Sequence, residues 1–92
     1  LTDILEATRL RYNERVMAQR LPSVTAREII AVLLRDGRYE VRSTGGHFQF
    51  KHTDKPGRVT VPVHGRSDIE RRILANIVVQ ASLSRDRFLE LI

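Results

Sequence analysis

The chain has 92 residues, of which 41% are hydrophobic and 29% are charged, a composition typical of a soluble globular domain. Cysteine and tryptophan are absent, which excludes disulfide bonds and thiolate metal sites and predicts a small aliphatic core. The longest apolar run, residues 29–34, is too short to cross a bilayer, and the first residues lack a signal-peptide pattern. We therefore expect a single cytoplasmic domain with no membrane partner.

Positive charge is concentrated in the middle of the chain. The chain has 16 Lys and Arg residues against 11 Asp and Glu residues, a net charge of +5. Residues 37–66 contain six basic residues against two acidic ones, together with all three histidines. Such a segment favours a polyanionic partner, most simply nucleic acid. The alternative is a solvated surface that only keeps the chain soluble.

The first nineteen residues are predicted to form a helical extension. Residues 3–19 contain no glycine or proline, and their apolar positions follow the helical period loosely. Pro22 then ends the pattern, because proline disfavours helix at the residue before it. We expect residues 1–19 to be an N-terminal appendage and residues 20–92 to form the main domain.

The main domain is predicted to open with a helix. Thr25 and Glu28 have the spacing of a capping box, in which each side chain accepts a hydrogen bond from the backbone N–H of the other residue. Apolar side chains at positions 29, 30, 33 and 34 then follow, and Gly37 suits the position just after a helix end.

Three alternating segments predict three strands. Residues 38–43, 47–52 and 58–63 alternate polar and apolar side chains, and the glycine pair at 45–46 and residues 53–57 supply the turns between them. We expect Tyr39 and Val41 to point inward. The opposite, polar face should display Arg38, Arg42, His47, Gln49, Lys51, Arg58 and Thr60.

Two more helices are predicted after the strands. Residues 67–70 have the pattern of a second capping box, opening a helix that should bury Ile69, Ile73, Ile77 and Val78. Ser84 is expected to cap a short last helix that carries Phe88, Leu89 and Ile92. The order predicts an α+β fold with an antiparallel meander, covered on one side by the two central helices.

His47 is the leading candidate for chemistry. It follows two glycines, which let a phosphate approach closely, and an imidazole can accept or donate a proton near neutral pH. From the residues alone, an exposed histidine without a role is the alternative. His52 shares the inward parity of Phe48 and is interpreted as structural. His64 is interpreted as fixing the turn after the third strand, with catalysis as the alternative.

A metal site built from the three histidines is disfavoured. His47 and His52 are five residues apart on one predicted strand. Side chains separated by an odd number of residues on a strand point to opposite faces of the sheet. These two rings therefore cannot share one metal ion, and we expect no metal.

Several segments resemble the HicA toxins, which are small bacterial ribonucleases of type II toxin–antitoxin systems. They are residues 21–37, Gly45-Gly46-His47, the VTVPVHG stretch at 59–65, and residues 84–91. The resemblance covers residues 20–92, and residues 1–16 have no counterpart in it. The family commonly has a serine or threonine where this chain has Gly46. The resemblance implies a fold like the double-stranded-RNA-binding domain, α-β-β-β-α, to which the residue pattern adds an extra helix before it and a short one after it.

The resemblance also implies an activity. Members cleave mRNA without a metal or other cofactor, using the histidine that falls at His47, and a HicB antitoxin covers that histidine. We therefore expect mRNA and a HicB-type antitoxin as partners. The ribose 2′-OH would attack the adjacent phosphate, with His47 as general base or acid. RNA should be bound by Arg42, Gly45, Gly46, Gln49, Lys51 and Arg58. The alternative is a non-catalytic RNA- or protein-binding module on the same fold.

Overall fold

The computed structural model describes residues 21–92, which form one three-stranded sheet and three helices. The sheet is antiparallel in the order β1-β2-β3. The elements are α2 (Ala26–Arg35), β1 (Arg38–Thr44), β2 (His47–His52), β3 (Val59–Pro62), α3 (Arg71–Gln80) and α4 (Arg85–Leu91). The predicted α+β fold, similar to the double-stranded-RNA-binding domain, is confirmed. The predicted N-terminal extension, residues 1–19, lies outside the described residues.

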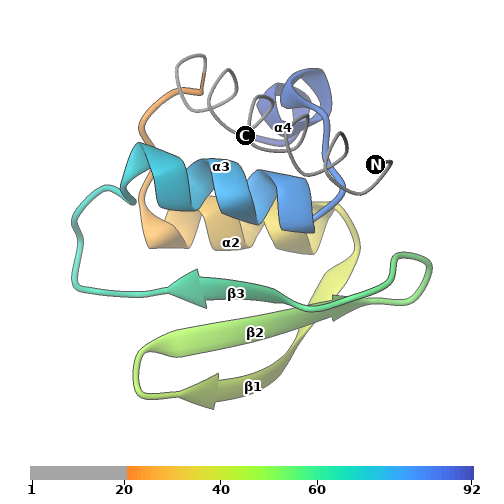
Figure 1. Ribbon diagram of the computed structural model, residues 1–92, viewed down its shortest axis with the longest axis horizontal. Coiled ribbons are helices and arrows are strands. Elements are labelled where there is room, and N and C mark those ends of the chain that lie inside the picture. Colours follow the sequence, from red (N-terminus) through yellow and green to blue (C-terminus); the bar gives the residue numbers. More distant parts are fainter. Residues whose placement is uncertain (1–20) are drawn as a thin grey trace, which may run out of the picture.

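The described elements lie in three layers. α2 and α3 run side by side over one face of the sheet, and α4 lies beyond them on the side away from the sheet (Figure 1). The core fills the space between sheet and helices, because the apolar faces of both must leave water. Its fully buried side chains include Ile29, Leu33, Phe50, Val59, Val61, Leu74 and Val78. No helix within residues 21–92 has the length and apolar character to span a membrane.

The predicted capping box at the start of α2 is confirmed. Thr25 Oγ1 accepts a hydrogen bond from Glu28 N at 3.2 Å, and Glu28 Oε1 accepts one from Thr25 N at 3.0 Å. Gly37 follows the helix end with a φ of +95°, a conformation that glycine adopts without strain. The apolar residues of this helix are not all buried: Leu34 is 52% exposed, because the buried stripe runs through Ile29, Val32 and Leu33.

The predicted capping box at residues 67–70 is wrong. Asp68 forms an isolated antiparallel bridge with Thr25, and Ile69 N donates to Val24 O at 2.8 Å. α3 begins only after Glu70, whose side chain makes no capping hydrogen bond. The backbone of this segment pairs with the chain just before α2, so a helix here would lose those hydrogen bonds.

The late start of α3 changes which side chains it buries. Ile69 is buried, but it lies before the helix. Leu74 is buried and Ile73 is 38% exposed. The predicted buried face of α3 was therefore right at Ile77 and Val78 and wrong at Ile73. In α4, Ser84 caps the helix as predicted, with its Oγ accepting from Arg87 N at 3.0 Å.

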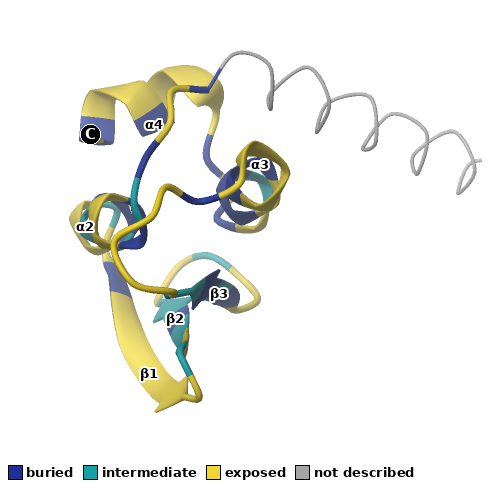
Figure 2. Ribbon diagram, turned by 90° about the vertical axis from the view of Figure 1, so that its left-hand side faces the viewer, coloured by how far each residue is buried: buried dark blue, intermediate teal, exposed yellow. Residues whose placement is uncertain are grey.

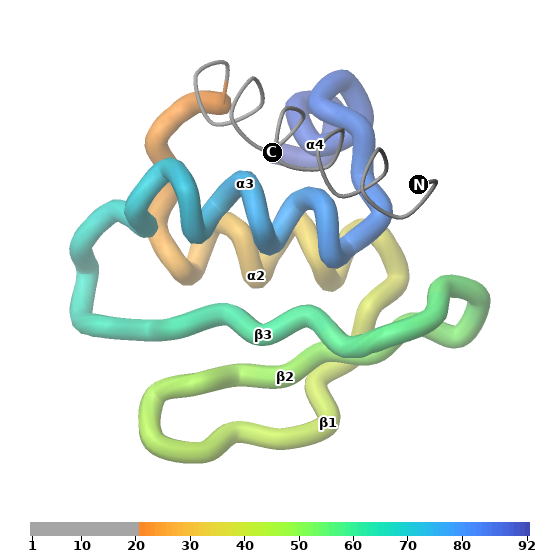
Figure 3. The backbone as a smooth tube through the Cα atoms, in the orientation of Figure 1, coloured from red at the N-terminus to blue at the C-terminus, as the bar shows by residue number. Residues whose placement is uncertain are grey.

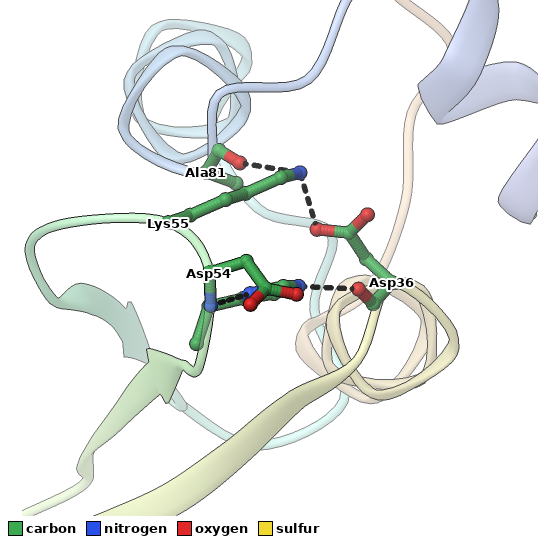
Figure 4. Close-up of polar contacts among 5 residues, drawn as sticks. Asp36, Asp54, Lys55 and Ala81 are labelled. Carbon is green, nitrogen blue, oxygen red and sulfur yellow. Dashed lines mark hydrogen bonds and ion pairs between the residues drawn. The ribbon is translucent and has the colours of Figure 1, made fainter.

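The loop between β2 and β3 is held against the helix ends (Figure 4). Lys55 Nζ donates to Asp36 Oδ2 at 2.7 Å and to Ala81 O at 3.3 Å. His52 Nδ1 accepts from Asp54 N at 2.9 Å, so its Nε2 carries the proton that is donated to Asp36 O at 2.8 Å. Both ring nitrogens of His52 thus serve the fold, and its structural interpretation is confirmed.

A bulge in β1 overturns the predicted faces of that strand. Glu40 pairs with Phe50 and Arg42 pairs with Gln49, so Val41 is an extra residue opposite no partner. Directly opposed residues share one face of a sheet. Arg42 therefore lies on the outer face with Gln49, as predicted, but the alternation before the bulge is reversed. Tyr39, expected inside, is 47% exposed, and all of β1 after its first residue is exposed (Figure 2).

The same reversal buries Arg38, which was expected on the polar surface. Arg38 is only 3% exposed. Within the described part of the chain, none of its three guanidinium nitrogens has a hydrogen-bond partner. Burial lowers the pKa of Arg38, and the nearby charge of Asp36 partly opposes that shift. A buried, unpaired cation of this kind costs folding free energy.

Replacing Arg38 with methionine should therefore stabilise the protein. Methionine keeps most of the aliphatic volume and removes the unpaired charge, so the free energy of unfolding should rise by about 1–3 kcal/mol. Urea denaturation measures the change. The matched control is Arg42→Met, on the exposed part of β1, which should shift stability by less than about 0.5 kcal/mol. A loss of stability in Arg38→Met would show that the guanidinium contributes to folding.

Candidate nucleic-acid interface

The face of the sheet opposite the helices is left uncovered by the described elements (Figure 2). The strand register places on it a set of mostly polar side chains. They are Tyr39, Arg42, Thr44, His47, Gln49, Lys51, Thr60 and Pro62. Arg58 immediately precedes β3 and joins them through Gln49. We call this set the outer face.

Hydrogen bonds hold two guanidinium groups on the outer face. Arg42 Nε donates to Thr44 Oγ1 at 3.1 Å, and Arg58 Nη1 donates to Gln49 Oε1 at 2.9 Å. Lys51 is half-buried and pairs across the strands with Tyr39. Because β2 is the central strand, Gln49 lies between the strand of Arg42 and the segment of Arg58.

The positive charge of the outer face is uncompensated. Within residues 21–92, the ion pairs are Lys55 with Asp36, Arg85 with Asp86, and Arg87 with Glu90, so Arg42, Lys51 and Arg58 have no carboxylate partner there. Cations without such partners attract a polyanion, and they do so more strongly at low salt. Three of the predicted RNA-binding residues, Arg42, Lys51 and Arg58, thus share one face and one sign of charge, and Gln49 lies among them.

The two glycines before His47 form the turn that the sequence predicted. Gly45 and Gly46 have φ angles of +58° and +81°, and positive φ at both central residues is what a two-residue type I′ hairpin requires. Gly46 O accepts a hydrogen bond from Val63 N at 2.7 Å. A Cβ atom on Gly46 would lie 3.1 Å from Val63 O, whereas one on Gly45 would meet open space.

The β1–β2 turn and the end of β3 lie at the same end of the sheet (Figure 3), and two histidines meet there. His47 begins β2 opposite Pro62, and His64 follows β3 two residues later. Their ring centroids are 6.1 Å apart, and the ring planes are nearly perpendicular, at 88°. Both residues are exposed. From the sequence, His47 was predicted to be catalytic and His64 to fix a turn, without a link between the two. Antiparallel pairing of the second and third strands nevertheless places the start of one strand beside the end of the other.

An open cleft of about 700 Å³ lies at the same end of the molecule. Its walls come from the start of α2, from β2 and from the segment after β3. They are formed by Thr25, Ala26, Arg27, Ile30, Phe48, Val63, Gly65 and Arg66. Phe48 and Val63 are half-buried, and each is the chain neighbour of a histidine of the pair. Because neighbouring side chains on a strand point to opposite faces, Phe48 lies on the helix side of the sheet, and the cleft opens there, across the sheet from His47.

The described side chains do not converge as metal ligands. Residues 21–92 contain no group of three or more His, Cys, Asp and Glu side chains placed to hold a metal ion. His52 is directed to Asp36 on the helix side of the sheet, while His47 lies on the outer face. These two histidines are therefore separated by the sheet, as their spacing on one strand predicted.

Substituting Gly46 should disturb this site more than substituting Gly45. Alanine at position 46 would be strained by the positive φ, and its Cβ would also crowd the Val63 carbonyl. The free energy of unfolding should therefore fall by about 1–3 kcal/mol. Gly45→Ala has only the φ to accommodate and is the matched control. Thermal unfolding measures the loss of stability, and the ring signals of His47 and His64 in NMR spectra report the disturbance of the site. Equal losses in both variants would show that the approach to Val63 is unimportant.

Comparison with known proteins assigns the chain to a family. A family model described as the HicA toxin of bacterial toxin–antitoxin systems matches residues 26–83, which is more than half of the chain and includes the sheet and both exposed histidines. No curated protein matches the sequence closely enough to count as a relative. The match agrees with the resemblance found in residues 20–92, and family membership implies a toxin with a cognate antitoxin as its partner. The chain therefore belongs to the HicA family of toxins.

Proposed function

We propose that this toxin is a metal-independent endoribonuclease that cleaves mRNA, with His47 as a catalytic residue and residues 20–92 as the toxin domain. The observation that carries the proposal is the position of His47. Its ring is exposed on the outer face, directly after a turn of two glycines, and uncompensated cations occupy the same face. A proton-transfer group and a phosphate-binding surface are thereby adjacent.

The chemistry follows from RNA itself. The ribose 2′-OH attacks the neighbouring phosphate, and His47 removes or supplies a proton in that step. Arg42, Lys51 or Arg58 stabilises the negative charge that develops on the phosphorane. Gly45 and Gly46 present backbone without a Cβ atom, which leaves room for the phosphate beside His47.

The partners follow from the same face. In this proposal mRNA binds the outer face in the cytoplasm, through Arg42, Gln49, Lys51, Arg58 and the glycine turn. The cognate antitoxin, of the HicB type, inhibits the toxin by covering His47. A non-catalytic RNA- or protein-binding module would use the same surface, and Gly46, in place of the family's usual hydroxyl residue, is the feature that favours it.

His47→Ala should fold normally and lose ribonuclease activity. The side chain is exposed, so its removal should change stability little, whereas loss of a proton-transfer group typically slows a reaction by about 10²–10⁴-fold. Cleavage of mRNA is compared for the wild type and the variant, with and without EDTA, after circular dichroism confirms that both are folded. EDTA should not reduce the wild-type rate.

Each result of that comparison has a definite meaning. A folded His47→Ala variant that cleaves as fast as the wild type would exclude His47 as the catalyst. Inhibition by EDTA would exclude the metal-independent mechanism. A folded wild type that binds RNA without cutting it would favour the non-catalytic module.

Removing cations from the outer face should flatten the salt dependence of RNA binding. Each phosphate contact with single-stranded RNA contributes a slope of about 0.7 in log K against log salt, so Lys51→Ala/Arg58→Ala should reduce the slope by up to about 1.4. Binding is measured in the His47→Ala background to prevent cleavage.

The matched control removes the same charge from another layer. Arg85→Ala/Arg87→Ala alters α4, which lies beyond the helices on the side away from the sheet (Figure 1). This double variant should keep the slope of the His47→Ala parent. A slope that falls in the α4 variant and not in the sheet variant would move the RNA-binding surface away from the sheet.

A further inference from the structure

We propose that His64 is the second proton-transfer residue of this site and acts with His47 on opposite sides of the scissile phosphate. The inference rests on the proposed ribonuclease function and extends it. It comes from the geometry at the end of the sheet, where the two exposed rings lie with their centroids 6.1 Å apart.

The reaction requires two proton transfers. As the 2′ oxygen forms its bond to phosphorus, it releases a proton to a neutral imidazole. As the bond from phosphorus to the 5′ oxygen breaks, that oxygen takes a proton from an imidazolium. The products are a 2′,3′-cyclic phosphate and a 5′-hydroxyl end, so atoms and charge balance without any further reactant. A single histidine supplies only one of these groups at a time.

The two rings are close enough to reach one phosphate after a small rearrangement. Imidazoles that each bond a different oxygen of one phosphate at about 2.9 Å have centroids roughly 8–10 Å apart, so the rings, now 6.1 Å apart, must turn away from each other to admit the phosphate. Within residues 21–92, neither His47 nor His64 makes a hydrogen bond through its ring, and the two rings meet only edge to face. Their nitrogens are therefore free to bind a ligand rather than committed to the protein.

The contrast with His52 argues against a purely structural role for His64. His52 uses both ring nitrogens, one with Asp36 O and one with Asp54 N. The segment before His64 is held instead by backbone, through the hydrogen bond from Val63 N to Gly46 O. The turn is thus fixed without the His64 ring, which is left exposed beside His47.

Neighbouring residues position His64 without a hydrogen bond to its ring. Pro62, whose φ is restricted by its own ring, pairs in register with His47. Gly65 follows His64 with a φ of +66°, a conformation suited to glycine. The backbone on both sides of His64 is therefore constrained, which keeps its imidazole close to His47 without a hydrogen bond to the ring.

The first test measures RNA cleavage by His64→Ala and His64→Asn. Both should remain folded and lose about 10²–10⁴-fold in rate, the usual contribution of a proton-transfer group. Asparagine retains hydrogen-bonding capacity but transfers no proton near neutral pH, so it would restore activity only if His64 had a structural role. His52→Asn is the matched control, and it should lower thermal stability while its folded fraction cleaves at the wild-type rate.

The second test asks whether the two histidines have complementary roles. The substrate is an RNA with sulfur in place of the 5′ bridging oxygen at the cleavage position mapped with the wild type. A thiolate leaves without protonation, so this substrate bypasses the general acid. One of His47→Ala and His64→Ala should regain most of its lost rate on the sulfur substrate, and the other should not.

The outcomes separate this inference from the proposed function. If His64→Ala cleaves ordinary RNA like the wild type while His47→Ala is inactive, His64 is not catalytic and the ribonuclease assignment stands. Restored cleavage in His64→Asn, or sulfur rescue of both alanine variants or of neither, also overturns the paired mechanism. A folded wild type that does not cut RNA overturns the ribonuclease function and this inference with it.

Discussion

One backbone hydrogen bond, from Val63 N to Gly46 O at 2.7 Å, determines the geometry of the candidate site. It fastens the end of β3 to the β1–β2 turn, and so it places the segments that carry His47 and His64 side by side. The approach favours glycine at position 46, because its φ is +81° and a Cβ there would lie 3.1 Å from the Val63 carbonyl, which would have to shift by a few tenths of an ångström. This chain thus has glycine, where the family commonly has serine or threonine, at the position where the turn approaches the Val63 backbone most closely.

The one-sided covering of the sheet explains why that site is accessible. A three-stranded sheet has one apolar face, and α2 and α3 cover it around Phe50, Val59 and Val61. The opposite face is free to carry cations, and three of them have no carboxylate partner within residues 21–92. Charge there costs little because it stays solvated, whereas Arg38 on the inner side is buried and unpaired.

Binding and chemistry are divided between different parts of the outer face. The cations lie along the strands, where they suit a polyanion without reading its sequence. The two imidazoles lie at one end, beside the glycine turn. In the proposed mechanism the first part holds the RNA backbone, and the second part moves protons at one phosphate. A partner that covers this end blocks the chemistry without having to distort the fold.

The sequence alone determined the features that depend on neighbouring residues. Thr25 and Glu28 predicted the start of α2, alternation predicted β2 and β3, and the glycine pair predicted the turn before His47, because caps, pleats and tight turns are governed by local backbone chemistry. Tertiary structure decided the rest. The start of α3 depends on the bridge between Asp68 and Thr25. The burial of Arg38 and the exposure of Tyr39 depend on a bulge that only the register with β2 defines. His47 and His64 are 17 residues apart in the chain. They meet only because β2 and β3 pair in register in the folded sheet.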